Sequence, residues 1–276
     1  MEWSIWILAV AVVFVAVVAS NRRKARDSAT EEFLSVFWYC PLEEFESLIS
    51  GGADVNAKTR SYTPEKWGRP LHNLATRGDD PKDLEKIRVL LRSGADVDGL
   101  NSEGRTPLVC LVESAAALGD WGKAASLLIS QGAKTDQINM QGATLLHTAA
   151  WAGRFSVVQV LLDAGADIDA RAPLTSIFIL HGDSAGTDVF GNVSRTTQGA
   201  LPLHFAAANV SVDVARIFLE NGANANSRTA DGITPLAIIQ ANRAKFSKDI
   251  AKGDTWAIRR KGSLDAFEAL ILANTN

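Results

Sequence analysis

The chain has 276 residues and a net charge of −3, with 28 Lys or Arg, 31 Asp or Glu and two cysteines. This slightly acidic balance excludes a broad basic surface for non-specific nucleic-acid binding. Two cysteines in a chain of this length exclude a disulfide-stabilised scaffold.

The chain begins with an uncharged, apolar segment at residues 3–20. A helix of this length rises about 1.5 Å per residue and spans roughly 27 Å, close to the hydrocarbon thickness of a bilayer. We therefore expect residues 1–20 to form a transmembrane anchor. A cleavable signal peptide is the alternative. It would carry positive charge before a shorter apolar core, whereas the charged side chain before this apolar segment is the acidic Glu2.

Basic residues follow the apolar segment and none precede it; they are Arg22, Arg23, Lys24 and Arg26. We expect residues 21–29 to form a basic juxtamembrane linker. The positive-inside rule then predicts that the rest of the chain lies on the cytoplasmic side of the membrane. The opposite orientation, towards a bacterial periplasm, stays open as the alternative.

From residue 30 onwards, two short phrases alternate along the chain. The first occurs at Gly52-Ala53-Asp54, Gly94-Ala95-Asp96, Gly132-Ala133-Lys134, Gly165-Ala166-Asp167 and Gly222-Ala223-Asn224. The second places a Gly shortly before Leu, and it occurs at 68–72, 104–108, 142–147, 199–204 and 232–236. Self-similarity at this period predicts a stacked array in which each unit buries its apolar face against its neighbours.

The most complete unit contains Leu145-Leu146-His147, Ala149-Ala150, Gly153 and Gly165-Ala166-Asp167. It resembles the ankyrin repeat, and the resemblance covers roughly residues 33–272. It implies an all-α repeat solenoid of helix pairs with β-hairpin fingers. Here this domain would occupy residues 30–276 as about six repeats including caps, preceded by one transmembrane helix. The resemblance also gives His72, His147 and His204 a structural role, in which the imidazole bonds to backbone or hydroxyl groups.

Two fingers carry insertions. From the Gly of the first phrase to the next hairpin Gly is 10 residues at Gly94, Gly132 and Gly222, but 16 at Gly52 and 34 at Gly165. The longer insertion, 172–195, is rich in apolar residues that a disordered loop would expose. We expect it to form an extended hairpin, with 175–180 paired against 187–195. We also expect Leu162, in the helix before it, to be buried between repeats.

The long insertion contains Gly182-Asp183-Ser184-Ala185-Gly186, which matches the Gly-x-Ser-x-Gly motif of serine hydrolases. That motif needs a complete sheet beneath the serine, and a finger insertion has no room for one. A serine hydrolase acting through Ser184 is therefore an alternative, and we expect no enzyme activity. A single His181 makes no metal site, so we expect neither metal nor cofactor.

The resemblance further implies where a partner binds, namely at the finger tips and at the variable residues that end each first helix. These positions are Arg60, Tyr62, Trp67, Thr76, Arg77, Met140, Trp151, Ala208 and Asn209. Trp151 is the strongest of them, because tryptophan often anchors interfaces. The sequence thus predicts a membrane-tethered, non-enzymatic adaptor or scaffold that binds a protein partner. A periplasm-facing scaffold or toxin-immunity protein is the alternative.

Overall fold

The structure is a computed structural model that describes residues 2–60, 67–114, 121–139, 142–173, 175–176, 196–251 and 255–275. For residues 2–18, 60, 175–176, 196–197, 244–245, 248–251 and 256–259 it describes the backbone alone. The chain divides into two compact units, Met1–Cys110 and Leu111–Asn276, and the boundary falls inside one short helix.

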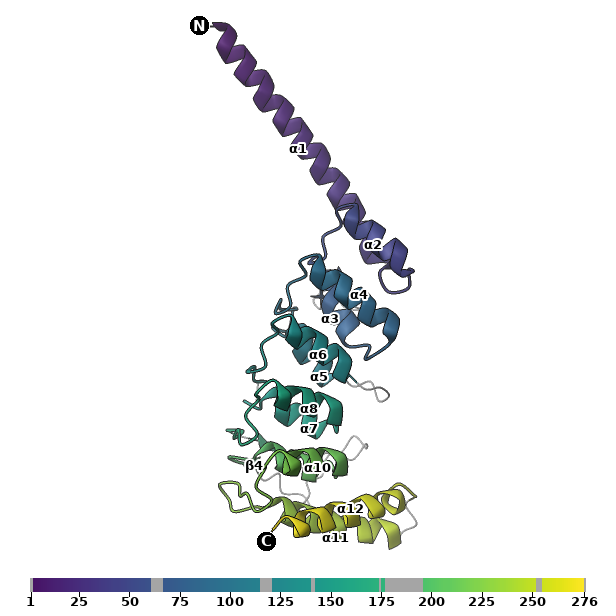
Figure 1. The fold of residues 1–276 in the computed structure, drawn as a ribbon, viewed down its shortest axis with the longest axis vertical. Coiled ribbons are helices and arrows are strands. Elements are labelled where there is room, and N and C mark those ends of the chain that lie inside the picture. The colour runs from purple at the N-terminus through teal and green to yellow at the C-terminus, as the bar shows by residue number, and fades with distance from the viewer. Residues whose placement is uncertain are drawn as a thin grey trace. The chain divides into compact units, whose positions relative to one another are not determined.

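Both units are built from pairs of helices that follow one another along the chain (Figure 1). The first unit contains α1 (Glu2–Val36), α2 (Leu42–Ser50), β1 (Thr59–Arg60), β2 (Trp67–Gly68), α3 (Pro70–Ala75), α4 (Pro81–Arg92) and the start of α5 (Pro107–Glu113). The second contains the end of α5, α6 (Gly122–Ser130), α7 (Leu145–Trp151), α8 (Phe155–Asp163), β3 (Thr175–Ser176), β4 (Thr196–Thr197), α9 (Pro202–Ala208), α10 (Val212–Glu220), α11 (Pro235–Ala251) and α12 (Thr255–Ala273). The expected helix pairs are confirmed.

The local sequence explains where the first helix of each pair begins. Four of these helices start with proline, at Pro70, Pro107, Pro202 and Pro235. Proline fits this position because its φ is already helical and because the first helical N–H groups have no partner within the helix. The hairpin glycines before three of these helices, Gly104, Gly199 and Gly232, have positive φ, for example +71° at Gly104, a region that glycine enters without a steric penalty.

The turn between the two helices of a pair also needs a left-handed residue. Gly78 and Gly153 fill this position with φ of +86° and +69°. In the next repeat the same position is Val210, with φ of +56° and only 6% of its surface exposed. A β-branched residue is rarely found in this region, so burial of the Val210 side chain offsets the backbone strain.

The predicted hairpin fingers are present at both insertions. In the first finger, Thr59 pairs with Gly68 and Arg60 with Trp67, antiparallel. In the long finger, Thr175 pairs with Thr197 and Ser176 with Thr196. The expected pairing of 175–180 against 187–195 is therefore wrong by two residues at its base. The reason is the bridge between Ala172 and Ala200, which fixes the register that the strands continue. The remainder of 172–195 lies outside the described residues.

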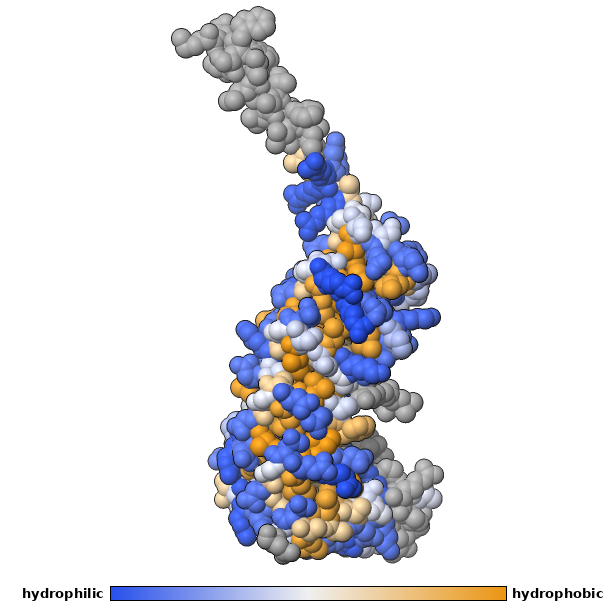
Figure 2. Space-filling view, in the orientation of Figure 1, coloured by the Kyte–Doolittle hydropathy of each residue, from blue (hydrophilic) through white to orange (hydrophobic). Residues whose placement is uncertain are grey.

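The N-terminal helix is longer than expected. α1 runs through residues 21–29, so the segment predicted as a linker is helical. Residues 19–28 are exposed on all sides and form a largely hydrophilic surface (Figure 2). Among the residues that the structure describes, no helix is both long enough and apolar enough to cross a membrane. The predicted anchor, 1–20, lies almost wholly outside the residues whose side chains are described.

The core is apolar and lies between the helices. In α8 the buried side chains are Val157, Val158 and Leu161, each with no exposed surface. Leu162, which we expected to be buried, is only half-buried. It lies one residue beyond Leu161 and therefore about 100° further round the helix, away from the buried stripe.

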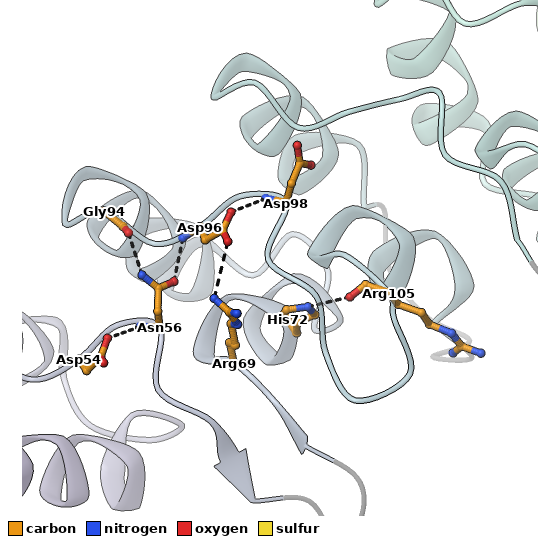
Figure 3. Close-up of polar contacts among 8 residues, drawn as sticks. All are labelled: Asp54, Asn56, Arg69, His72, Gly94, Asp96, Asp98 and Arg105. Atoms are coloured by element: carbon orange, nitrogen blue, oxygen red, sulfur yellow. Dashed lines mark hydrogen bonds and ion pairs between the residues drawn. The ribbon is translucent and has the colours of Figure 1, made fainter.

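Three histidines join successive repeats, as the resemblance implied. The Nε2 atoms of His72, His147 and His204 lie 3.0, 3.0 and 3.1 Å from the carbonyl oxygens of Arg105, Ala200 and Ile233 (Figure 3 shows the first). A carbonyl can only accept, so each Nε2–H donates. Nδ1 of His147 accepts from the backbone N–H of Thr144, and Nδ1 of His204 accepts from that of Leu201, both at 3.2 Å. These bonds require neutral rings.

We predict that the fold loses stability in mild acid because of these histidines. Burial lowers the pKa of His147 and of His204 from 6.5 to about 4. Between these pH values the unfolded chain binds the extra protons, so the free energy of unfolding is highest above pH 6.5 and falls as the pH drops to about 4. In this range the free energy of unfolding falls by at most about 1.4 kcal/mol per pH unit for each histidine. Denaturant unfolding of the wild type and of the His147→Gln/His204→Gln variant at several pH values measures this. An equally steep pH dependence in the variant would contradict the assignment.

We also predict that neighbouring leucines of α8 differ sharply in their contribution to stability. Leu161→Ala should lower the free energy of unfolding by about 2–5 kcal/mol because it opens a cavity in the core. Leu162→Ala, which removes the same atoms from a half-buried position, is the matched control and should cost clearly less. Hydrogen exchange should show the Leu161→Ala damage concentrated in the adjacent helix pairs, because coupling in a repeat array is between neighbours.

Candidate protein-binding surface

Exposed aromatic and basic side chains lie just after the ends of α1 and α3, the first helices of the first two pairs. α1 is followed by Phe37-Trp38-Tyr39-Cys40, in which Phe37 and Cys40 are buried while Trp38 is 39% and Tyr39 75% exposed. The guanidinium of Arg77, which follows α3, lies 5.6 Å from the Trp38 ring centroid. We call Trp38, Tyr39 and Arg77 the aromatic–arginine surface.

Arg77 is oriented by a carboxylate. Its Nε donates to Oδ2 of Asp83, a residue of α4 that is only 4% exposed. Within the described residues, nothing accepts a hydrogen bond from the two terminal nitrogens of Arg77. Almost half of the Arg77 side chain is exposed. The guanidinium is therefore pre-oriented beside the indole while its outer edge faces solvent, an arrangement that suits a carboxylate acceptor.

Polar contacts between successive loops fix the base of the first finger (Figure 3). The amide of Asn56 makes two bonds to the next loop: Nδ2 donates to the Gly94 carbonyl at 2.9 Å, and Oδ1 accepts from the Asp96 N–H at 2.8 Å. Asp96 in turn lies 3.7 Å from Nη1 of Arg69, the residue after β2. Asn56 thereby ties two consecutive loops together, and Arg69 attaches the finger to them.

The predicted finger residues are only partly described. Trp67 is half-buried; its N–H donates to Ser102 Oγ at 3.0 Å and its carbonyl accepts from the Ser102 N–H at 3.0 Å. Nζ of Lys58 lies 4.1 Å from the Trp67 ring centroid. Trp67 is thus engaged with its neighbours. The Arg60 side chain, Tyr62 and Met140 lie outside the described residues, as do His181 and Ser184.

The predicted residues in the second unit are less available than expected. Trp151 is half-buried, and its ring meets Phe205 edge-on at 6.4 Å. Ala208, which we predicted to contact a partner, is 3% exposed, so its side chain does not reach the surface. The reason is that every residue of α9 is buried. The Asn209 side chain donates to Ser211 Oγ at 3.0 Å, and the backbone carbonyl of Asn209 accepts from Arg260 Nη1 at 2.8 Å.

Several basic side chains are used to close helix ends. Nζ of Lys86 donates to the Phe37 carbonyl at 2.9 Å, Arg154 donates to the Ser114 carbonyl, and Arg260 binds Asn209 as described above. The last carbonyls of a helix lack partners within it and attract positive charge. Burial lowers the pKa of both Arg154 and Arg260. These cations are structural, which leaves Arg77 as the exposed guanidinium beside the exposed aromatics.

Sequence reasoning missed Trp38 and Tyr39. The sequence does not single them out, because the first helix pair lacks the hairpin phrase that marks the later repeats. The available signal was their position at the end of a first helix, the place that Thr76 and Arg77 occupy in the next repeat. Thr76 itself is half-buried, and its hydroxyl donates to the Asn73 carbonyl at 2.8 Å. Across the described part of the chain no cluster of His, Cys, Asp or Glu could hold a metal ion.

Two protein-family models match the sequence. One, described as ankyrin repeats (3 copies), matches residues 82–172, and another, described as ankyrin repeats (many copies), matches residues 191–239. Together they cover about half of the chain.

Curated relatives match over the same region. The chain is 30% identical over 168 residues to human "Ankyrin repeat and SOCS box protein 3", which covers 56% of this chain and 32% of that protein. It is 29% identical over 183 residues to rice "Probable E3 ubiquitin-protein ligase XBOS32", and this match covers 62% of this chain and 34% of that protein. It is 30% identical over 172 residues to a Caenorhabditis elegans "Transient receptor potential cation channel subfamily A member 1 homolog", and this match covers 62% of this chain and 11% of that protein.

The chain thus spans about a third or less of the length of these relatives. Their names differ in kind, so the shared property is the repeat and not one activity. The two repeating phrases, the helix pairs with their hairpin fingers and the matching family models agree, and the chain belongs to the ankyrin-repeat family.

Proposed function

We propose that this protein is a non-enzymatic adaptor that binds a protein partner through the aromatic–arginine surface and is tethered to a membrane by residues 3–20. Ankyrin repeats imply protein–protein interaction, and relatives named as a ubiquitin ligase and as a cation channel share these repeats with this chain. A module that serves such different proteins supplies recognition and leaves their particular activities to other parts.

One observation carries the choice of surface: Trp38 is 39% exposed beside Arg77, and the residue that follows it, Tyr39, is 75% exposed. The core beneath is already filled by Phe33, Phe37 and Phe45, which are at most 1% exposed. Trp, Tyr and Arg are the residue types that dominate binding energy at interfaces. The Trp38 ring packs on Phe37, with centroids 4.8 Å apart, yet 39% of Trp38 and 75% of Tyr39 stay exposed, which supports a role in recognition.

The tether is supported by the apolar composition of residues 3–20 and by the helical backbone of α1. The basic residues that follow it favour the cytoplasmic side for the repeats. The opposite, periplasmic orientation and a serine hydrolase acting through Ser184 are the competing proposals. Labelling of a Lys82→Cys variant by an impermeant thiol reagent in intact cells separates the two orientations, because Lys82 is exposed. A fluorophosphonate probe tests Ser184.

We predict that the aromatic–arginine surface is required for partner binding and not for folding. Trp38→Ala, Tyr39→Ala and Arg77→Ala should each weaken binding of the partner by at least about tenfold. Phe155→Ala is the matched control, because Phe155 is 50% exposed at the start of a second helix and is not part of the aromatic–arginine surface. The measurement is quantitative capture of the partner from detergent-solubilised membranes.

Folding is checked in the same variants. Phe37→Ala should lower the free energy of unfolding by about 3–5 kcal/mol, and Trp38→Ala should cost clearly less because 39% of Trp38 is exposed. If Trp38→Ala binds normally and Trp151→Ala does not, the second unit provides the binding surface instead. If no variant affects capture, the proposed surface is wrong.

We predict that the full chain resists carbonate extraction from membranes, while a chain beginning near Asp27 is extracted and keeps its helical circular dichroism. An apolar helix of 18 residues that spans the bilayer is removed by detergent and not by high pH. Full-length protein that is extracted, with a new N-terminus near residue 20, would identify residues 1–20 as a signal peptide and contradict the tether.

A further inference from the structure

α1 is one continuous helix that belongs to two different environments. No Gly or Pro occurs before Pro41, and the helix runs from Glu2 to Val36 without interruption. Residues 19–28 are exposed, and the contact that the structure describes between this section and the repeats is the ion pair of Arg26 with Asp54. It contains Ala, Arg and Lys, which are strong helix formers. The exposed section is therefore held helical by its own propensity and by its continuity with the packed end.

The last turns of α1 are fixed firmly in the first repeat. Phe33 is fully buried, and its ring centroid lies 5.8 Å from that of Phe37 and 5.3 Å from that of Phe45 in α2. Lys86 of α4 binds the Phe37 carbonyl just beyond the helix. Because α1 is continuous, these contacts set the direction in which its exposed section leaves the repeats.

A polar clamp reinforces this direction where α1 leaves the core. The Thr30 hydroxyl donates to the Arg26 carbonyl at 2.8 Å and accepts from the Asp54 N–H at 2.9 Å. Nη2 of Arg26 pairs with Oδ2 of Asp54 at 3.2 Å. Asp54 also accepts from the Asn56 N–H at 2.9 Å, and Asn56 binds the next loop (Figure 3). The contacts thus run from the helix into two successive loops.

We propose that α1 is a rigid stalk, directed by Phe33, Phe37 and the clamp of Arg26, Thr30 and Asp54, which holds the aromatic–arginine surface at a set height above the bilayer. The inference rests on the proposed tether. Val36 is 16 residues beyond Ser20, so the helix carries it about 24 Å from the membrane end of the stalk.

A surface held at a fixed height above the bilayer favours a partner that is anchored in the same membrane. A soluble partner reaches the surface at any height, and a rigid stalk gives it no advantage. A segment anchored in the same membrane is confined near one height, and matching heights raise its effective concentration at the surface. The partner that fits is therefore the juxtamembrane part of another integral membrane protein. Its docking segment carries a carboxylate for Arg77 beside an apolar side chain for Trp38.

The stalk is tested first in detergent, without any membrane. Spin labels at Arg23→Cys and Lys82→Cys, in a Cys110→Ser full-length background, report the distance between the exposed section of α1 and α4. Pulsed electron paramagnetic resonance should give one narrow distance distribution. Replacing Asp27 and Ser28 by two glycines should broaden it, and Arg22→Ala, which removes an exposed cation outside the clamp, should not. A broad distribution in the unaltered stalk would overturn the proposal.

The set height is tested with the partner captured in the binding experiment. Inserting seven alanine-rich helical residues between Lys24 and Ala25 lengthens the stalk by about 10 Å while nearly preserving the helical phase, and it leaves the clamp intact. In detergent, binding should equal that of the wild type. In vesicles containing both proteins, binding should fall at least about tenfold. Equal binding of both lengths in vesicles would overturn the set height, whereas loss of binding by Trp38→Ala in detergent tests the surface separately.

Discussion

A helix pair in this chain has apolar sides that it cannot bury alone, and the remaining features of each unit follow from the need to stack neighbouring pairs within that unit. Stacking leaves backbone groups at every loop and helix end that must find partners in the neighbouring repeat. The histidine bonds from His72 to Arg105, His147 to Ala200 and His204 to Ile233 meet this need at the helix starts. Lys86, Arg154 and Arg260 meet it at the helix ends. Since these groups are committed to the stack, they are poor candidates for recognition.

Side chains at the ends of first helices are the ones we predicted to bind a partner. Three of them make local contacts instead. Thr76 hydrogen-bonds to its own helix, Asn209 hydrogen-bonds to Ser211, and the Trp151 ring packs against Phe205. Trp38 and Tyr39 differ because the phenylalanines beneath them already fill the core. Among the described residues, the best candidate for recognition is this exposed aromatic pair, in which Trp38 lies beside an arginine oriented by a buried carboxylate.

The N-terminal helix gives this chain a property that a bare repeat array lacks. In an array, the first helix of the first repeat only covers the stack. Here the same helix continues beyond the stack for several exposed turns, and the contacts of Arg26 and Thr30 with Asp54 join it to the first loop. The first repeat therefore covers the end of the array and holds the proposed stalk, and it also carries Trp38 and Tyr39 of the proposed recognition surface.

The sequence alone determined the repeat family, the number and order of helix pairs, the place of both fingers and the role of the three histidines. These depend on local rules: proline at helix starts, glycine at left-handed turns and apolar spacing along helices. Only the tertiary structure decided which residue of an adjacent pair faces inward, as with Leu161 and Leu162, because burial depends on the orientation of the whole helix. It also showed Ala208 buried, set the register of Thr175 with Thr197 through the bridge at Ala172, and made 21–29 part of α1. The aromatic–arginine surface was beyond the sequence for the same reason: Trp38 and Arg77 are far apart along the chain, and only the packing of one repeat on the next brings them together.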